Sequence, residues 1–326
     1  MGSGMFPQDR KFALAILDDA ALHTIEEARL IYRLLIELGL TATKTVWASA
    51  CKNGGGLPDT RCTLEDPEYR DFILELRDQG IEIGWAGAAR ESSARQQTIE
   101  ALDYFREVVG YDPRVQVNGA LNRENLYWGT HRIDQPLLKA VVQRAEPVSV
   151  GYYNGHVEDS PFWWGDVCSD HIDYVLNLTF DDVNLARINP SMPYQDPTRP
   201  WVRQWFSGSE AQTCIEFNQL LRPDRQEKLE REAGYSVVAT SFARGFVRGN
   251  VLDRLARKRL ESMAARGGWF VTVSTLLDHL RARRSDVCIG ADEWNRMQWK
   301  WARDVVRKRV RSSGPKDVNW RDAAIG

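Results

Sequence analysis

Apolar runs and amphipathic segments alternate along most of the chain. Residues 12–17 form an unbroken apolar run that ends in Asp18 and Asp19, the pattern of a buried strand. Thr24-Ile-Glu-Glu27 then forms a capping box, and apolar residues at helical spacing follow as far as Gly39. This order predicts one strand followed directly by one helix.

The same strand–helix unit recurs later in the chain. Alternating apolar positions predict strands over residues 41–48, 81–85, 236–241 and 269–273. Helical periodicity, with start signals such as Asp66-Pro67, predicts helices over residues 66–80, 93–109, 251–266 and 275–284. Strands that alternate with helices favour a parallel sheet wrapped by helices, either open or closed into a barrel. We therefore predict an α/β fold.

Two stretches depart from this rhythm. Residues 151–209 are rich in tryptophan and proline and predict a long irregular insertion that covers a site. After residue 286 the chain becomes basic and amphipathic. We expect residues 8–286 to form one main domain and residues 287–326 to form a C-terminal helix and tail.

The C-terminal helix has an apolar face that needs a partner. This face is marked by Trp294, Met297, Trp301 and Val305. Packing against the main domain or against a second subunit of a homo-oligomer is the favoured interpretation. Peripheral contact with an anionic membrane is the alternative, because the other faces carry basic residues.

The composition of the chain limits which binding partners and which cellular compartment we expect. With 43 basic and 45 acidic residues the net charge is −2, and no nucleic-acid-binding motif occurs, so we expect a small or neutral ligand and no nucleic acid. Residues 1–7 are expected to be a disordered tag, and no signal peptide or membrane span follows them, which predicts a cytoplasmic location. The five cysteines lack a paired spacing and are expected to be free thiols.

The most informative feature is the pair of carboxylates, Asp18 and Asp19, at the end of the first strand. Buried acids are costly and usually have a function. Because strand residues alternate faces, one of the two side chains points into a central site and the other enters from the rim of the next loop. This geometry suits a metal ligand beside a general base. The alternative is that one acid caps the loop before the helix.

Several short segments carry a family resemblance through their order and spacing. They are Ile16-Leu-Asp-Asp19, Leu38-Gly-Leu-Thr-Ala-Thr-Lys-Thr-Val46, Gln79-Gly-Ile-Glu-Ile-Gly84, Ser92-Ser-Ala-Arg-Gln-Gln-Thr98 and Gly268-Trp-Phe-Val271. Together they make residues 11–280 similar to the polysaccharide deacetylase (NodB-homology) family, carbohydrate esterase family four. The resemblance implies a distorted (β/α) barrel with its site at the carboxyl ends of the strands. It also implies that Asp18 is a general base, that Asp19 binds a divalent metal and that the ligand is a carbohydrate or a sugar-derived molecule.

The chain departs from this family where the metal should bind. The family has two metal-binding histidines four residues apart, and Ala86 and Arg90 stand at those positions here. Ser241 ends the late strand that usually carries a further histidine. Neither alanine nor a guanidinium replaces an imidazole, and a guanidinium would repel a divalent cation. We therefore predict no metal site and no other cofactor.

A second aspartate pair matches the family's first motif more literally. It lies in Leu178-Thr-Phe-Asp-Asp182, inside the irregular stretch and followed by Pro190 and Pro193 where a helix should begin. We therefore expect Asp181 and Asp182 to be turn, loop or rim acids.

Other side chains are candidates for chemistry or for binding. Glu82 and His171 are candidates for acid/base work beside Asp18 and Asp19, and Arg90 for an ion pair that takes the place of a metal. Asparagine amides suit sugar hydroxyls and tryptophan faces suit sugar rings, although asparagines also make turns and tryptophans also fill cores. The candidate substrate-binding residues are Trp85, Arg90, Asn118, Asn122, Trp128, Trp163 and Trp164.

Three functional hypotheses follow from these residues. The first is a deacetylase-like protein that binds a sugar without hydrolysis. The second is an enzyme that uses its acids for metal-independent chemistry on a sugar derivative. The third is an active deacetylase whose metal is held by a non-standard set of ligands. Metal analysis separates the third hypothesis from the others, and turnover separates the first two.

Overall fold

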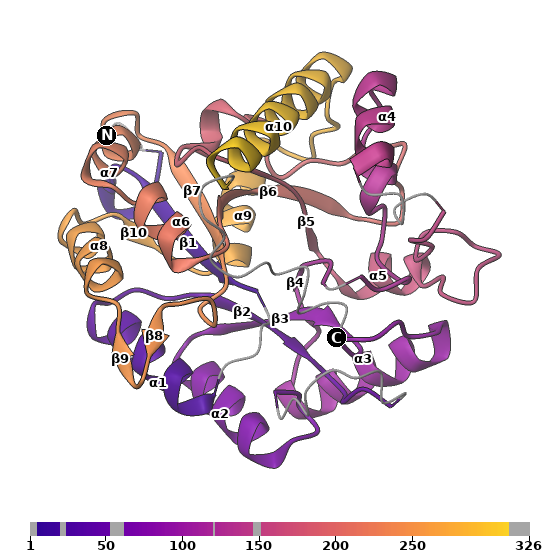
Figure 1. Cartoon of the computed structure of the whole chain (residues 1–326), viewed down its shortest axis with the longest axis horizontal. Helices are drawn as coiled ribbons and strands as arrows, with labels where there is room; N and C mark the ends of the chain where they lie inside the picture. The colour runs from indigo at the N-terminus through magenta and orange to yellow at the C-terminus, as the bar shows by residue number, and fades with distance from the viewer. Residues whose placement is uncertain (1–4, 20–23, 53–61, 120, 146–150, 313–326) are drawn as a thin grey trace.

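A closed barrel of parallel strands forms the centre of the molecule (Figure 1). The computed structural model describes residues 5–19, 24–52, 62–119, 121–145 and 151–312. The main sheet is built from β1 (Ala13–Asp18), β2 (Thr43–Trp47), β3 (Glu82–Gly87), β4 (Val115–Gln116), β5 (Tyr174–Phe180), β6 (Gln204–Ala211), β7 (Tyr235–Thr240) and β10 (Trp269–Phe270). Strands β1 to β7 pair in chain order, and β1 also pairs with β7, which closes the ring. The predicted distorted (β/α) barrel is therefore confirmed.

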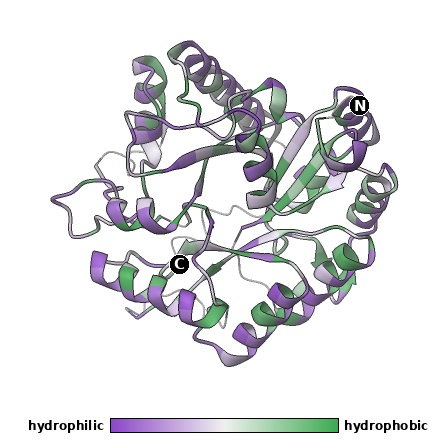
Figure 2. Ribbon diagram, turned by 180° about the vertical axis from the view of Figure 1, so that it is seen from behind, coloured by the Kyte–Doolittle hydropathy of each residue, from purple (hydrophilic) through white to green (hydrophobic). Residues whose placement is uncertain are grey.

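Helices cover the outside of the barrel (Figure 1). They are α1 (Ile25–Glu37), α2 (Pro67–Asp78), α3 (Arg95–Val109), α4 (Pro136–Ala145), α5 (Gly165–His171), α6 (Cys214–Leu220), α7 (Pro223–Arg231), α8 (Arg254–Ala265), α9 (Val273–Ala282) and α10 (Ala291–Ser312). Shorter elements are the 3-10 turns η1 (Pro7–Asp9), η2 (Gly129–Arg132) and η4 (Leu185–Arg187) and the hairpin strands β8 (Val247–Arg248) and β9 (Val251–Leu252). Apolar and polar patches alternate along the helices in Figure 2, as expected when one face of each helix is buried.

The first helix begins where the sequence signal places it. The Thr24 hydroxyl accepts a hydrogen bond from the Glu27 N–H at 3.2 Å, which caps the amino end of α1. Ile31, Leu34 and Leu35 on the inner face of this helix are buried. Local capping and apolar spacing therefore fix the helix that follows the aspartate pair.

The stretch predicted as one irregular insertion, residues 151–209, contains two strands of the barrel. β5 pairs with β4 and β6, and β6 pairs with β7, so both strands belong to the closed ring. Irregular backbone is confined to the segments around α5 and between β5 and β6. The prolines lie in those connecting segments, because proline interrupts the hydrogen bonding of a central strand.

Helix α9 lies across the amino-terminal end of the barrel. At its start, the Val273 N–H donates to Thr43 Oγ1 at 2.8 Å and the Ser274 N–H donates to Glu82 Oε2 at 3.2 Å. Further along α9, the Asp278 carboxylate accepts hydrogen bonds from both terminal nitrogens of Arg114, each at 2.8 Å. Because the strands are parallel, these contacts close the end opposite to the carboxyl ends where Asp18 lies.

Helix α10 completes the wall beside β5. Trp294, Met297 and Trp301 on its inner face are buried. The Gln298 side-chain oxygen accepts hydrogen bonds from the backbone N–H groups of residues 134 and 135 at 2.6 and 3.0 Å. The C-terminal helix therefore packs against the main domain, which agrees with the favoured interpretation of its apolar face.

The amino-terminal segment contributes a side chain to the core. Phe6 is buried and packs 6.2 Å from the ring of Trp269, so the core begins inside the range of residues 1–7 that was predicted as a disordered tag. Residues 1–4 lie outside the described part of the chain. The five cysteines are free thiols. None of the described helices is long and apolar enough to cross a membrane.

Candidate functional site

Asp18 lies at the carboxyl end of β1 with its side chain completely buried. Its Oδ2 atom accepts hydrogen bonds from the Tyr32 hydroxyl at 2.8 Å and from Lys44 Nζ at 2.9 Å. Its Oδ1 atom accepts a hydrogen bond from the Phe242 N–H at 2.9 Å. Because Tyr32 belongs to α1, the carboxylate points from the strand toward the surrounding helices. Every oxygen of this acid is occupied by the protein itself.

Lys44 is the cation that balances Asp18. It lies on β2 in register with Asp18 on β1, and its side chain is also completely buried. Burial alone would lower the pKa of the Lys44 ammonium, but the Asp18 carboxylate raises it, and the net pKa lies above the ordinary value. The ammonium also lies 5.9 Å from the centroid of the Tyr32 ring. A protein lysine therefore occupies the role that was expected for Arg90 or for a metal ion.

Asp19 follows at the end of the described strand segment. Its backbone N–H donates to the Thr240 carbonyl oxygen at 2.8 Å, and its side chain is partly exposed. Residues 20–23 after it lie outside the described part of the chain. Of the two adjacent acids, Asp19 is the one that retains contact with solvent.

Arg90 stands three residues beyond β3 and is partly buried. Burial lowers the pKa of its guanidinium, and the neighbouring thiols Cys51 and Cys62 oppose this shift. Its Nη1 atom is buried and has no hydrogen-bond partner among the described residues. Arg90 is therefore a cation at the strand ends with an unused donor, and Lys44 makes the ion pair with Asp18 in its place.

Trp47 fills the space between the carboxyl ends of β2, β3 and β4. A Cβ atom added to Gly87 would lie 2.5 Å from its ring, and one added to Gly119 would lie 2.6 Å from it. The backbone of Gly87, with φ of 142°, is one that other residues rarely adopt. The indole thus needs two glycines to fit, and its Nε1 atom is buried without a described partner. Neither Trp47 nor Lys44 was predicted as a site residue from the sequence.

Glu82 and His171 lie at the opposite end of the barrel from Asp18. Glu82 begins β3, and burial raises its pKa although Thr43 and Ser274 donate hydrogen bonds to it. His171 ends α5 just before β5, and its Nδ1 atom lies 3.2 Å from Arg106 Nη2. Parallel strands place both residues at amino-terminal strand ends, so the structure does not bring them to Asp18 and Asp19 as predicted.

Two of the candidate tryptophans are core residues. Trp85 is fully buried and packs edge-on against Phe105 of α3 at 5.8 Å. Trp164 is 1% exposed, and its Nε1 atom donates to the Glu124 carbonyl oxygen at 2.7 Å. Neither ring has a face open to a sugar, so their predicted role in substrate binding is replaced by packing.

The other two candidate tryptophans are covered by arginines. The Arg95 guanidinium lies 4.4 Å from the ring centroid of Trp163 and also binds Asp166. The Arg132 guanidinium lies 4.1 Å from the ring centroid of Trp128. These cation–π contacts use the ring faces that were expected to stack on a sugar.

The candidate asparagines hold the loop that follows β4. Asn118 donates to the Leu126 carbonyl oxygen at 3.0 Å and accepts from the Leu126 N–H at 3.1 Å. Asn122 donates to the Ala89 carbonyl oxygen at 2.7 Å and to Glu124 Oε1 at 3.0 Å. Both amides are buried in these contacts, so the turn-making alternative accounts for them.

Glu124 in the same loop is a buried acid. Its side chain accepts hydrogen bonds from the Ser93 N–H at 3.0 Å and from Asn122. Burial raises the pKa of Glu124 to about 7, although these hydrogen bonds favour its charged form. The loop over the carboxyl end of β3 and β4 therefore contains a carboxyl group that titrates near neutral pH.

The second aspartate pair sits directly after β5. Asp181 Oδ1 accepts from Arg225 Nη1 at 2.7 Å, and Asp182 Oδ1 accepts from Lys228 Nζ at 3.1 Å. Both cations come from α7. The prediction of loop or rim acids agrees with these surface ion pairs, although the segment before them is a barrel strand.

The residues at the strand ends do not fit the divalent metal that the family resemblance implies. Asp18 is committed to Lys44, and Ala86 and Arg90 provide no ligand atoms. Across the residues that the structure describes, no group of three or more histidine, cysteine, aspartate or glutamate side chains is placed to hold a metal ion. A divalent cation would also meet the partly buried guanidinium of Arg90.

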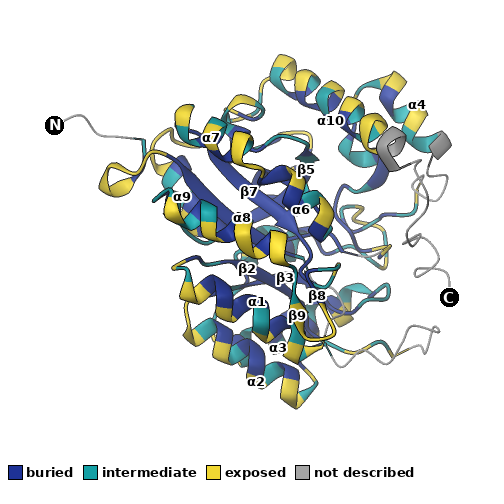
Figure 3. Ribbon diagram, turned by 60° about the vertical axis from the view of Figure 1, so that its left-hand side comes forward, coloured by how far each residue is buried: buried dark blue, intermediate teal, exposed yellow. Residues whose placement is uncertain are grey.

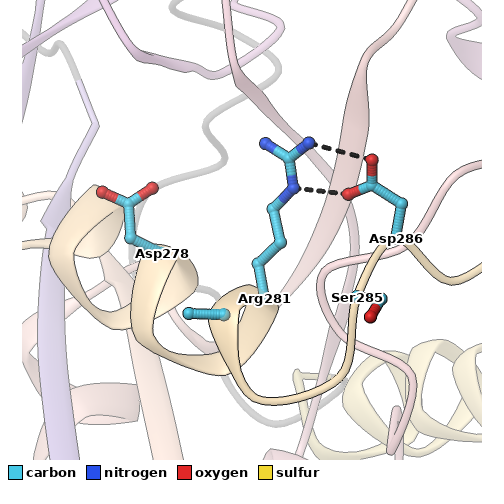
Figure 4. A pocket seen from close by; sticks show the side chains of 5 residues that line it. Asp278, Arg281, Ser285 and Asp286 are labelled. Atoms are coloured by element: carbon cyan, nitrogen blue, oxygen red, sulfur yellow. Dashed lines mark hydrogen bonds and ion pairs between the residues drawn. The ribbon is translucent and has the colours of Figure 1, made fainter.

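Figure 4 shows a surface hollow of about 470 Å³ beside α9. It is lined by Asp278, Arg281, Ala282, Ser285 and Asp286. Arg281 donates to both oxygens of Asp286, and Asp278 binds Arg114. Its charged groups are therefore already engaged in ion pairs, and it opens beside α9 at the amino-terminal end of the barrel.

Comparison with known proteins identifies the fold. No protein-family model and no curated protein sequence matches the chain. Among solved structures, the chain is similar to a protein from Mycobacterium smegmatis provisionally assigned as a polysaccharide deacetylase, with a TM-score of 0.50, 13% identity and coverage of 88% of this chain and 96% of the other.

Two further structures show lower similarity. A Puue allantoinase has a TM-score of 0.48 and 13% identity over 86% of this chain and 93% of its own. The chitin deacetylase of the fungal pathogen Colletotrichum lindemuthianum has a TM-score of 0.40 and 15% identity over 82% of this chain and 88% of its own. The similarity to the Mycobacterium smegmatis structure shows that the chain has the distorted (β/α) barrel fold of the polysaccharide deacetylases.

Proposed function

We propose that this protein binds a carbohydrate or sugar-derived molecule at the carboxyl ends of its strands, without metal-dependent deacetylation. A contrast between neighbouring groups carries the proposal. The acid expected to act as general base is buried in an ion pair with Lys44, whereas donors at the same strand ends have no hydrogen-bond partner among the described residues. The similar structure from Mycobacterium smegmatis carries the name of a polysaccharide deacetylase, which supports a carbohydrate ligand, and barrels of this kind place their sites at the carboxyl ends of the strands.

The unused donors indicate what the ligand offers. Trp47 Nε1, Arg90 Nη1 and Ser241 Oγ are buried and lack hydrogen-bond partners among the described residues. Buried donors are normally satisfied by protein, water or ligand. Hydroxyl, carbonyl or carboxylate oxygens of a sugar derivative would supply acceptors for them. A guanidinium favours a carboxylate or another anionic group in particular.

Asp18 is poorly placed to remove a proton from water. A general base must lie within hydrogen-bond reach of the proton that it takes, and every oxygen of Asp18 already faces a donor from Tyr32, Lys44 or Phe242. Moving this carboxylate into the barrel mouth would leave the Lys44 ammonium buried in the core without its counter-ion. Hydrolysis by the base expected from the resemblance would therefore require the core to rearrange.

Paired binding and turnover measurements test the proposal. The purified protein is titrated calorimetrically with acetylated and deacetylated chito-oligosaccharides and with uronic-acid oligosaccharides, and acetate release is followed with and without added Zn²⁺, Co²⁺ or Mg²⁺. We expect saturable binding without acetate release. Arg90→Ala should lower the affinity at least about tenfold, as expected for loss of a charge-assisted hydrogen bond.

Arg222→Ala is the matched control, because Arg222 is an exposed arginine that pairs with Asp224 at the surface. It should leave the affinity unchanged. Acetate release that disappears in Asp18→Asn would overturn the proposal in favour of an active deacetylase. Stoichiometric metal in the purified protein that is lost on Asp19→Ala would also overturn it. Absence of binding to all these sugars would remove the carbohydrate part of the proposal.

A further inference from the structure

The outer faces of α4 and α10 form a continuous edge of the molecule. The two helices contact one another, and in Figure 3 they lie side by side with exposed residues facing outward. Four large apolar side chains on them are exposed: Leu137 at 71%, Val141 at 60%, Trp299 at 49% and Val306 at 58%. We call this edge the α4–α10 face.

The exposed residues of α10 follow one stripe. Arg296, Trp299, Arg303 and Val306 are exposed and follow one another at intervals of three or four positions, and the exposed Arg307 lies four positions after Arg303, so all five lie on one side of the helix. The buried residues of α10 lie on the opposite side. On α4, Leu137 and Val141 are four positions apart and share one side. The apolar residues of this face are thus arranged together instead of scattered.

The charge of the α4–α10 face is predominantly basic, and the exposed acid Asp292 lies only in the first turn of α10. The sequence of α4 contains no aspartate or glutamate, and from residue 294 onward α10 contains only Asp304, which is buried and paired with Lys300. Arg296, Arg303 and Arg307 form no ion pair with any described residue. In a chain with a net charge of −2, this face therefore stands out as locally cationic.

We propose that the α4–α10 face binds the surface of an anionic lipid membrane. Arginines on a helix surface are attracted to anionic headgroups, and an exposed tryptophan is suited to the headgroup region of a bilayer. Leu137, Val141 and Val306 provide apolar area that can enter the interface between headgroups and acyl chains. A subunit interface here would bury arginines that have no acidic partner on this face, at the cost of their hydration.

Membrane binding through the α4–α10 face leaves the barrel mouth free. Asp18 and Lys44 lie on β1 and β2, and α10 packs on β5 across the ring from them. A protein held by the α4–α10 face would thus keep its strand ends open to a ligand at the membrane surface. The membrane proposal stands on the helix faces alone and does not depend on the proposed function.

Vesicle sedimentation tests this inference. The full chain is mixed with vesicles of phosphatidylcholine alone or with about one third phosphatidylglycerol, a fraction chosen to give a strong surface potential. We expect binding only to the anionic vesicles and a decrease in binding as salt is raised. The double variant Arg296→Glu, Arg303→Glu should lower the vesicle affinity at least about tenfold, and Trp299→Ala should also lower it.

Helix α8 provides the matched control. Arg254 and Lys258 are exposed on α8, and their replacement by glutamate changes the net charge of the chain by the same amount as the α10 variant. This control should retain vesicle binding within about twofold, because α8 lies on another side of the barrel (Figure 1). Thermal unfolding of each variant verifies that it folds. Equal losses in the α8 and α10 variants, or no binding of the unaltered chain, would overturn the inference. The inference would also be overturned if light scattering showed a dimer of the unaltered chain and Trp299→Ala dissociated it.

Discussion

Lys44 Nζ lies 2.9 Å from Asp18 Oδ2, and both side chains are inaccessible to solvent. The pair joins β1 to β2 at the carboxyl ends of the strands, and Tyr32 ties it to α1. A buried ion pair need not add net stability, because both groups lose their hydration. Removal of one partner is costly, however, since it leaves the other charge buried and uncompensated.

We expect Lys44→Met to lower the free energy of unfolding by about 3–5 kcal/mol. The double variant Lys44→Met, Asp18→Asn should recover part of this loss, because the remaining groups are neutral. Urea denaturation of the four members of this double-mutant cycle measures the coupling. Lys11→Met is the control, since Lys11 makes an exposed ion pair with Glu230 and should change stability by less than about 1 kcal/mol. Similar losses in both single lysine variants would contradict the buried pair.

The position of Asp18 could be predicted from the sequence, but its direction could not. The apolar run before it and the capped helix after it place it at a strand end, as the structure shows. Alternation along a strand gives two opposite faces without saying which one meets the barrel mouth. The signal for the answer was Lys44, a lysine within a strand otherwise made of buried residues, because a lysine there requires a nearby acid.

β5 and β6 were harder to predict than the strands of the first half. Asn177, Thr179 and Glu210 interrupt their apolar patterns, and the flanking helices α5 and α6 are only 7 residues long each. These polar residues are satisfied by partners that only the fold brings together, such as Tyr194 for Asn177 at 3.2 Å. Long-range pairing of this kind leaves no local trace in sequence, which is why barrel strands were interpreted as a cover.

Glu124 should make stability depend on pH. Its pKa is raised to about 7 by burial, so the folded protein binds this proton more tightly than the unfolded chain, whose glutamates titrate near 4.3. The stabilising contribution is complete below about pH 4.3 and is lost as pH rises through about 7, at about 1.4 kcal/mol per pH unit between the two values. The stability advantage of the unaltered chain over Glu124→Gln should therefore shrink from pH 4.5 to 7.5. A constant difference in urea denaturation across this range would rule out titration of Glu124.

The candidate tryptophans should separate into packing and surface residues. Trp85→Ala removes a fully buried ring that packs on Phe105, and we expect a loss of about 3–5 kcal/mol in the free energy of unfolding. Trp163→Ala removes a partly exposed ring covered by Arg95, and the loss should be clearly smaller. Thermal and urea unfolding compare the two directly. If neither change altered stability but both weakened sugar binding, the predicted stacking role would be restored.

Lys308 connects the C-terminal helix to the barrel mouth. Its Nζ atom lies 2.9 Å from Glu210 Oε1 at the end of β6 and 2.8 Å from Glu216 Oε1 on α6. Lys308→Glu should turn these attractions into repulsion and release the last described turns of α10. We expect faster amide exchange over residues 301–308, with a change in global stability below about 1 kcal/mol because the lysine side chain is 50% exposed.

Arg307→Glu isolates the contribution of the Lys308 contacts from that of helix charge alone. Arg307 is the preceding residue on α10, is exposed and makes no ion pair with a described residue, yet its replacement changes the charge by the same amount. It should leave amide exchange in the helix nearly unchanged. If both variants accelerated exchange equally, the effect would come from helix charge, and Lys308 would not hold α10 against the carboxyl end of β6. A selective effect of Lys308→Glu would show that the C-terminal helix is fastened at the same end of the barrel where we place the ligand.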